Sequence, residues 1–314
     1  MALTLLKRTT VLVVSIVVAS IVVFAFMAVL PGNPAEVALG TNATPEAVQQ
    51  LEHEFGTDRP LVTQYADWAG GLLHGDFGVS YTTRDAIGPQ ISDRIQVTLI
   101  LVLAAGLVAL AIAVPFGVIA AARHRRRSGV VLSAASQLGA AIPAFIAGIL
   151  FVSVFAVQLG WLPSSGWIAP DDDFVGFLKQ LVLPALSLGL VEGAVLTRYV
   201  RSATLEILRE DFLRTARAKG MTSTQALVRH GLRNAAIPVV TVLGLQLSLL
   251  LVGAVVIERV FVLPGIGSLL LDAVSNRDLL TVQGVVMVLT LLVLLINYVV
   301  DVLYVGIDPR LRKS

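Results

Sequence analysis

The sequence predicts an all-α membrane protein with six transmembrane helices, a small extracytoplasmic helical cap and a helical loop in the cytoplasm. The mean hydropathy of the 314 residues is +0.85. Only 14% of the residues are charged, a balance that a water-soluble chain of this length could not bury in a core. Long uncharged stretches recur along the chain, and the positive charges gather in alternate connections. The absence of cysteine excludes disulfides and thiolate sites.

Each span needs roughly 20 mostly apolar residues. The fourth uncharged window is shorter than this unless its helix extends through Glu192 to about Tyr199. Pro115 and Pro143 lie inside the second and third windows, and we expect kinks there because proline removes a backbone donor. The six windows are Thr9 to Leu30, Val97 to Ala122, Val130 to Leu159, Leu181 to Val191, Ile237 to Ile257 and Val282 to Val300.

The distribution of lysine and arginine predicts the orientation. These residues concentrate at the N-terminus, in 123–127, in 198–233 and in the C-terminal tail, so both termini are expected in the cytoplasm. The other connections are richer in acids and hold all three tryptophans. We therefore divide the chain into an N-terminal segment with the first span (1–30), an extracytoplasmic cap (31–96) and a transmembrane core (97–314) that contains a polar loop (201–236).

The cap is too long for a bare connection, so it is predicted to be ordered. The run Thr44–Glu46 is typical of a helix start, with an N-cap, a proline and an acid. Four later residues recur at helical spacing and would form an apolar stripe. The stripe suits a lid packed on its own bundle, and the same surface could also dock a solute-binding protein. The stripe residues are Leu61, Tyr65, Trp68 and Leu72.

The polar loop carries two helix signatures. In the first, Glu210 and Arg214 have the spacing of an i,i+4 ion pair. Four apolar residues would share one face of the same helix. Gly220 fits the position after a helix that ends near Lys219. The apolar face consists of Leu205, Leu208, Phe212 and Ala216.

The second signature begins directly afterwards. Residues 222–225, Thr-Ser-Thr-Gln, have the spacing of a capping box, which predicts a short helix running toward Asn234. Pro238 fits the first turn of the fifth span. A helix, a glycine and a second helix would make a compact knob suited to a groove on a partner. An interfacial helix pair on anionic lipid fits the same arginine-rich pattern, and the physics alone leaves both alternatives open.

Several segments together resemble one family. Residues 214–220 (RTARAKG) and 230–238 (HGLRNAAIP) resemble the cytoplasmic loop of binding-protein-dependent ABC importers, in the dipeptide, oligopeptide and nickel permease branch. Most members of the wider class have Glu and Ala where Arg214 and Thr215 stand here. Further segments that resemble peptide permeases are GDFGVS at 75–80, VFVLPGIG at 260–267, NRD at 276–278 and DPR at 308–310.

The resemblance implies a permease subunit of a bacterial inner membrane, which imports di- or oligopeptides delivered by an external solute-binding protein. It also implies a second homologous permease chain and two ATPase subunits that bind ATP and Mg. One alternative is that the same complex imports nickel or another small solute. A second alternative is that the chain is a stand-alone secondary transporter. The residues implied to dock the ATPase through a coupling helix are Arg214, Thr215, Ala216, Arg217, Ala218, Lys219, Gly220 and Thr222.

The sequence predicts no enzyme. No Gly-Lys dipeptide is present, so a phosphate-binding loop for ATP is expected on another chain, with no cofactor on this one. A Gly-x-Ser-x-Gly elbow is also missing, and no catalytic residue is predicted. His53-Glu54 lacks the second histidine of a zincin helix, and the other histidines are scattered, which favours surface roles over metal ligation. We see no nucleic-acid signature.

Polar residues within the spans are candidates for the solute pathway, because ionisable groups in a bilayer are costly and tend to face a cavity or a partner. Gly244 and Gly253 in the fifth span would let helices approach closely. The last two candidates are one turn apart and should share a face near the cytoplasmic end, where a structural link is favoured over solute contact. The candidates are Glu192, Gln246, Asn297 and Asp301.

Overall fold

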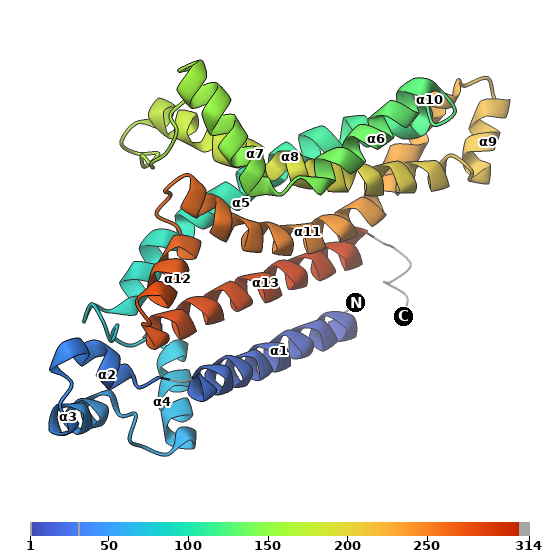
Figure 1. Cartoon of the computed structure of the whole chain (residues 1–314). Helices are drawn as coiled ribbons and strands as arrows, with labels where there is room; N and C mark the ends of the chain where they lie inside the picture. The colour runs from blue at the N-terminus through green and yellow to red at the C-terminus, as the bar shows by residue number, and fades with distance from the viewer. Residues whose placement is uncertain (1, 31, 308–314) are drawn as a thin grey trace. The chain divides into compact units, whose positions relative to one another are not determined.

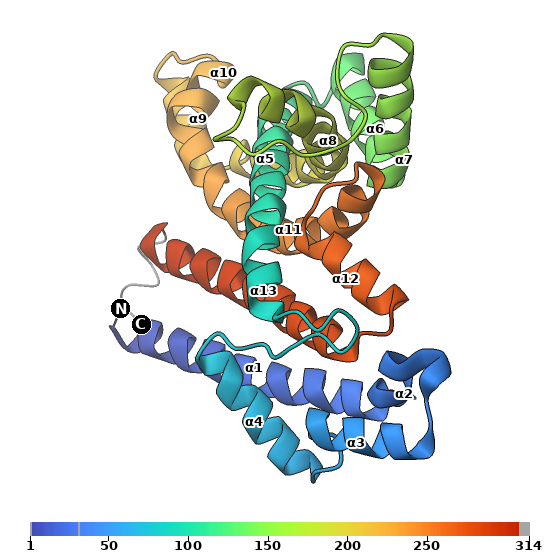
Figure 2. The same cartoon turned by 90° about the vertical axis from the view of Figure 1, so that its left-hand side faces the viewer.

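The computed structural model describes residues 2–30 and 32–307 (Figures 1 and 2). Within these ranges the regular structure is helical, apart from an isolated antiparallel bridge between Val79 and Ala86. The predicted all-α class is therefore confirmed. Residue contacts divide the chain into two compact units, which we describe separately. Unit 1 comprises Met1–Leu5, Leu99–Leu263 and Ile296–Ser314, and unit 2 comprises Leu6–Thr98 and Pro264–Leu295.

Among the described residues, five helices are long and apolar enough to cross a membrane, or six spans if one bent pair is counted as a span. This agrees with the six predicted windows. The bent pair, α6 (Arg127–Ala141) with α7 (Ala144–Phe151) and the π-helical turn Val152–Gln158, covers the third window. The five long helices are α1 (Ala2–Val29), α5 (Ile87–Ala122), α8 (Phe174–Ile207), α11 (Leu232–Val260) and α13 (Leu279–Ile307).

Proline has different effects in two of these helices. Ile142 and Pro143 are both extended, and Pro143 is the N-cap of α7, so the expected kink is a complete break that bends the pair by 94°. In α5 the helix continues through Pro115 without a break. The fourth window proved to be the middle of a much longer helix, because the Asp173 side chain caps α8 by accepting a hydrogen bond from the Val175 N–H at 3.0 Å.

In unit 2, α2 (Pro34–Leu39), α3 (Pro45–Phe55) and α4 (Leu61–Leu73) form the helical part of the cap. The Thr44 hydroxyl caps α3 as predicted, accepting from the Ala47 N–H at 3.3 Å. The predicted stripe lies on α4, and its aromatic rings contact α1 within unit 2. The Phe24 ring of α1 lies 5.4 Å from the Tyr65 ring and 6.0 Å from the Trp68 ring.

The apolar core of unit 2 joins the start of α5 to α12 (Ile266–Ser275) and the first part of α13. The Thr98 hydroxyl accepts a hydrogen bond from the Ile266 N–H at 2.9 Å, which fixes the start of α12 against α5. These contacts join the segment that follows the cap helices to α12 and α13. The buried core residues are Ile87, Ile91, Ile266, Leu269, Val285 and Val288.

Unit 1 is built around α8, which packs against α6, α7 and α11. Glycines allow the close approach of its helices. A Cβ at Gly189 of α8 would lie 2.6 Å from the Ala105 carbonyl oxygen of α5. In α11, a Cβ at Gly244 would lie 2.5 Å from Val300, so the predicted close approach at this glycine is confirmed.

Candidate functional site

The first helix of the polar loop differs from the prediction. α8 continues to Ile207, the chain turns, and α9 (Asp211–Ala218) starts after the turn. The predicted apolar face is wrong at Phe212, which is 38% exposed, because the new helix start turns Leu213 inward instead. The predicted pairing of Glu210 with Arg214 is also wrong, since the arginine Nη1 lies 3.2 Å from an Asp211 carboxylate oxygen. That ion pair is exposed and contributes little to stability.

The break between α9 and α10 lies where the sequence predicted it. Lys219 ends the helix, and Gly220 has a φ of +94°, a conformation that side chains with a Cβ rarely adopt. The capping box is complete: the Thr222 hydroxyl accepts from the Gln225 N–H at 3.2 Å, and the Gln225 side-chain oxygen accepts from the Thr222 N–H at 3.0 Å. Both predictions for this turn are confirmed.

The second helix of the polar loop is joined directly to the fifth span. α10 (Ser223–Ala226) passes through the π-helical turn Leu227–Gly231 into α11 without an extended linker. Pro238 therefore lies inside α11, and its predicted place in the first turn of the span is wrong. In Figure 1, α9 and α10 lie together at one end of α8.

The two short helices of the polar loop share a small apolar cluster of their own. Leu213, Ala216 and Ala226 are buried in it, and Ile207, Leu208 and Met221 pack against them. Of the eight predicted docking residues, Ala216 is buried and the other seven are exposed. An open cleft of about 610 Å³ lies between α9 and α10, lined by Arg214, Arg217, Ala218, Met221, Thr222 and Ser223.

The structure brings together two of the four pathway candidates. The Gln246 amide of α11 donates to the Glu192 carboxylate of α8 at 2.5 Å, and Gln246 is only 7% exposed. Sequence reasoning selected both residues but did not pair them. Asn297 and Asp301 lie one turn apart on α13, as predicted, and both are half-buried.

Sequence reasoning missed the anchor of a cap loop. Asp278, which is 3% exposed, directly precedes α13 and accepts from the hydroxyls of Ser80 and Thr281, each at 2.6 Å. It also accepts from the Tyr81 N–H at 3.2 Å and the Thr82 hydroxyl at 3.3 Å. Burial, and to a lesser extent the charge of Asp278, raises the pKa of the Tyr81 hydroxyl. The N-cap spacing of Asp278 and Thr281 was the local signal that could have revealed it.

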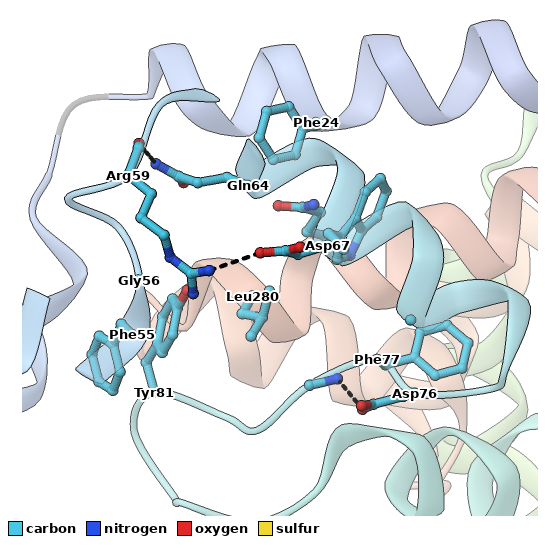
Figure 3. A pocket seen from close by; sticks show the side chains of 14 residues that line it. Phe24, Phe55, Gly56, Arg59, Gln64, Asp67, Asp76, Phe77, Tyr81 and Leu280 are labelled. Carbon is cyan, nitrogen blue, oxygen red and sulfur yellow. Dashed lines mark hydrogen bonds and ion pairs between the residues drawn. The ribbon is translucent and has the colours of Figure 1, made fainter. Parts of the chain in front are cut away.

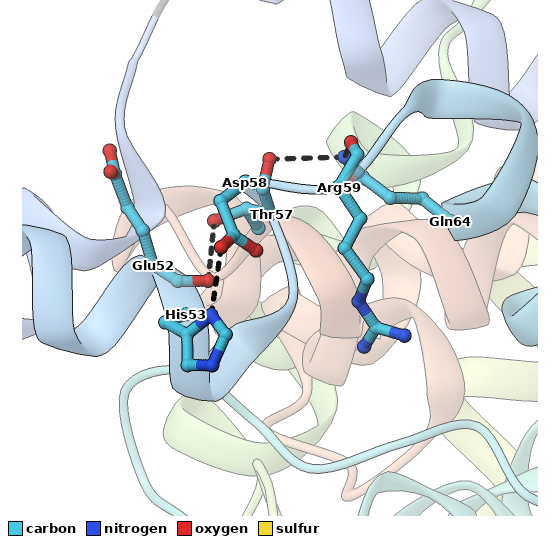
Figure 4. A network of polar contacts seen from close by, with 6 residues as sticks. All are labelled: Glu52, His53, Thr57, Asp58, Arg59 and Gln64. Atoms are coloured by element: carbon cyan, nitrogen blue, oxygen red, sulfur yellow. Dashed lines mark hydrogen bonds and ion pairs between the residues drawn. The ribbon is translucent and has the colours of Figure 1, made fainter.

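The histidines do not form a cluster of potential metal ligands in the part of the chain that the structure describes. In residues 2–30 and 32–307, no three His, Asp or Glu side chains are placed to hold a metal ion. His53, near the end of α3, instead bonds at 2.8 Å to Asp58 in the turn that follows (Figure 4). That hydrogen bond lowers the pKa of the exposed Asp58 carboxyl.

Comparisons with known proteins agree with this architecture. The family model "Binding-protein-dependent transport system inner membrane component" matches residues 113–313, and the model of its N-terminal part matches residues 1–102. The glutathione transport system permease protein GsiC of Escherichia coli (strain K12) is 38% identical over 307 residues, 98% of each chain. A candidate peptide transport system permease of Brucella abortus (strain 2308) is 39% identical over 308 residues, also 98% of each chain.

A solved structure has a similar fold. The inward-facing MetNI methionine ABC transporter, in its native crystal form, contains a chain that matches with a TM-score of 0.57 at 20% identity. The match covers 69% of the present chain and 96% of the other. The chain therefore belongs to the family of binding-protein-dependent transport system inner membrane components and is a multi-pass permease subunit of an ABC importer.

Proposed function

We propose that this permease subunit translocates di- or oligopeptides that an external solute-binding protein delivers. The observation that carries the proposal is the similarity, over 98% of the chain, to permeases named for glutathione and for peptides. Glutathione is itself a tripeptide. Nickel or another small solute is the alternative cargo for the same machine. Membership of a binding-protein-dependent family favours both over a stand-alone secondary transporter.

The proposed machine contains a second homologous permease chain, two ATPase subunits and the solute-binding protein. ATP and Mg are assigned to the ATPase subunits, because this sequence contains no Gly-Lys dipeptide and hence no phosphate-binding loop. In this proposal the subunit supplies the membrane pathway and the surface on which an ATPase subunit docks.

The polar loop is the proposed surface for the ATPase. Its two short helices are held together by their own apolar cluster, so they can act as one body. Its basic and hydroxyl side chains remain exposed around the cleft between α9 and α10. A compact helical knob of this kind suits a groove on a protein partner.

The proposed solute pathway passes along α8. Glu192 and Gln246 bond to each other across α8 and α11, as expected for polar groups inside a membrane bundle. A cavity of about 310 Å³ lies between α6 and α8, and Ser136, Gln137 and Arg198 give it a polar lining. Asn297 and Asp301 are further candidates on α13.

The orientation of the subunit is tested with single cysteines, because the native chain has none. A membrane-impermeant thiol reagent is expected to label cysteines at Asp172 and Ala47 from outside and to spare those at Ser128 and Ser223. Ser128 lies in the first turn of the bent pair, Asp172 lies beyond its end, and both are exposed, so opposite labelling of the two shows that the pair crosses the membrane. Labelling of both from one side would make the pair re-entrant. Reversed labelling of all four would overturn the orientation.

The docking role is tested by Gly220→Val. The variant places a β-branched side chain at a φ of +94°, while a Cβ there meets no atom within 4 Å, so the strain arises in the backbone alone. A left-handed conformation costs such residues roughly 1–2 kcal/mol, and 1.4 kcal/mol corresponds to about tenfold in an equilibrium. We expect normal membrane insertion, with co-purification of the ATPase and ATP-dependent dipeptide uptake both reduced about tenfold.

Two control variants separate docking from general strain. Gly160→Val introduces the same kind of strain at a φ of +63° outside the polar loop, and it should keep the ATPase bound. Gly220→Asn should also keep it, because asparagine tolerates left-handed conformations. Normal assembly and normal uptake by Gly220→Val would contradict the docking role and favour an interfacial helix pair on anionic lipid instead. A wild-type complex that takes up nickel but no dipeptide would reject the peptide proposal.

A further inference from the structure

A second cleft in unit 1, of about 400 Å³, lies between the end of α5, the end of α8 and the two short helices of the polar loop. Three arginines line it: Arg125 in the turn after α5, Arg209 in the turn after α8, and Arg217 in α9. All three residues are exposed, so a ligand entering the cleft can reach their side chains. We call this feature the basic cleft.

The positive charge of the basic cleft is not balanced by acids of the subunit. No acidic residue lines the cleft, and across residues 2–30 and 32–307 none of its three arginines forms an ion pair. Asp211, which lies nearby in the sequence, is paired with Arg214. The two segments that build the cleft, 122–128 and 201–230, contain ten lysines and arginines, four in the first and six in the second, against three acids. The cleft therefore attracts an anion.

The cavity in the cap differs from the basic cleft in its charge. That cavity has a volume of about 230 Å³, and its arginine, Arg59, donates to Asp67 at 2.9 Å (Figure 3). Asp76 is a further acid in the same lining. The charged residues around the cap cavity therefore sum to a negative charge, whereas arginines alone, apart from a histidine, supply the charge of the basic cleft.

The donors of the basic cleft fit a phosphate group. A guanidinium group binds phosphate oxygens through paired N–H bonds, and several guanidinium groups can share one phosphate because it has several acceptor oxygens. Ser223 and Thr224, the first two residues of α10, add exposed hydroxyls to the lining. The cleft thus combines charge with further hydrogen-bond donors on its opposite wall.

The apolar part of the lining favours a phospholipid over a free phosphate. The uncharged stretch of α5, a candidate span, ends at Ala122, and this residue lines the cleft. The basic cleft therefore begins where a membrane helix reaches the edge of the bilayer. Three leucines complete the lining and suit the apolar part of a lipid: Leu205, Leu208 and Leu227. Basic pockets of this kind beside membrane spans bind the headgroups of anionic lipids.

We propose that the basic cleft binds the phosphate of an acidic phospholipid from the adjacent membrane leaflet. The three arginines and the two hydroxyls hold the phosphate, and the leucines contact the start of the apolar part. A lipid bound there joins the polar loop to the ends of α5 and α8. The site does not depend on the proposed cargo, and it holds whether or not the polar loop also docks the ATPase.

Native mass spectrometry of the purified full-length subunit measures this binding without an ATPase. The subunit in detergent is titrated with phosphatidylglycerol and with phosphatidylcholine of identical acyl chains, and the dissociation constant of the first bound lipid is determined. Phosphatidylglycerol carries a net negative charge, whereas the choline cation cancels that of phosphatidylcholine. We expect phosphatidylglycerol to bind at least about tenfold more tightly, and an excess of inorganic phosphate should not displace it.

The double variant Arg125→Gln with Arg209→Gln tests the cleft and leaves the residues proposed to dock the ATPase intact. An arginine near a membrane surface strengthens the binding of acidic lipid by about fivefold. We therefore expect the double variant to bind phosphatidylglycerol at least about tenfold more weakly, with phosphatidylcholine unaffected. The charge-preserving pair Arg125→Lys with Arg209→Lys should retain most of the affinity.

Arg126→Gln with Arg229→Gln is the matched control. It removes the same charge from exposed residues of the same two segments, outside the lining of the cleft, and should keep the tight binding of phosphatidylglycerol. Both glutamine pairs should unfold at the temperature of the parent, because they alter exposed side chains without ion pairs.

Three results would overturn the proposal. Equal affinity of the parent for the two lipids would remove the selectivity for acidic lipid. An equal loss of affinity in the two glutamine pairs would assign the binding to overall charge rather than to the basic cleft. Displacement of phosphatidylglycerol by inorganic phosphate would make a free anion the occupant in place of a lipid.

Discussion

Replacing Asp278 with alanine is expected to release the loop of residues 76–86 from α13 and to destabilise it by about 3–5 kcal/mol. Hydrogen bonds to a charged group contribute roughly 1.5–3 kcal/mol each, and Asp278 accepts two short ones from hydroxyls. Ser80 and Thr281 are 1% and 2% exposed, so their hydroxyls would be left buried without this acceptor. The truncation therefore removes an interaction and creates two unsatisfied groups.

Trypsin cleavage after Arg84 measures the effect, because this exposed residue lies inside the released loop. A change of 3–5 kcal/mol corresponds to an increase in the open population of roughly a hundredfold or more, and cleavage follows that population when opening is fast. Asp93→Asn alters an exposed acid on α5 and should leave cleavage at the wild-type rate. Cleavage of Asp278→Ala at the wild-type rate would show that the loop is held by other contacts.

Gly189→Leu is expected to destabilise unit 1 strongly. A Cβ at this position would lie 2.6 Å from the backbone oxygen of Ala105 and 2.7 Å from Val108, so neither neighbour can move aside as a flexible side chain would. Forcing extra atoms into a packed interface costs typically 1–3 kcal/mol and occasionally more. With backbone in the way, we expect about 3 kcal/mol and a loss of contact between α5 and α8.

Denaturation of the purified subunit in mixed micelles gives this difference directly. Gly70→Leu is the matched control, because Gly70 lies within α4 and a Cβ there meets no atom within 4 Å. Leucine is a better helix former than glycine, so the control should be unchanged or more stable by up to about 1 kcal/mol. A Gly189→Leu subunit as stable as the parent would mean that α5 and α8 pack less closely than these distances indicate.

The features that the sequence predicted correctly are those set by neighbouring residues. Thr222 and Gln225 form their capping box, Gly220 takes a positive φ, and Thr44 caps α3, because each depends on a few bonds along one stretch of chain. The apolar windows located the spans for the same reason. Hydrophobic length is a local property, whereas the ends of a helix depend on what caps it.

The features that it did not predict join distant segments. Ser80 and Asp278 are 198 positions apart, and Glu192 and Gln246 are 54 positions apart, so no periodicity relates the members of either pair. The restart of the helix at Asp211 also had no strong local signal, and the shift in register moved Leu213 rather than Phe212 into the cluster. Pairing and register of this kind are decided by tertiary packing.

The break at Pro143 also restricts where lipid can sit around the subunit. A backbone that leaves the helical conformation exposes amide and carbonyl groups, and hydrocarbon offers them no partner. The corner between α6 and α7 bends by 94° and carries Ile142 in an extended conformation, within a stretch apolar enough for the bilayer. At membrane depth this corner must be sealed by protein or wetted by water. Acyl chains are therefore not expected to contact the free backbone groups of this corner wherever it lies within the bilayer.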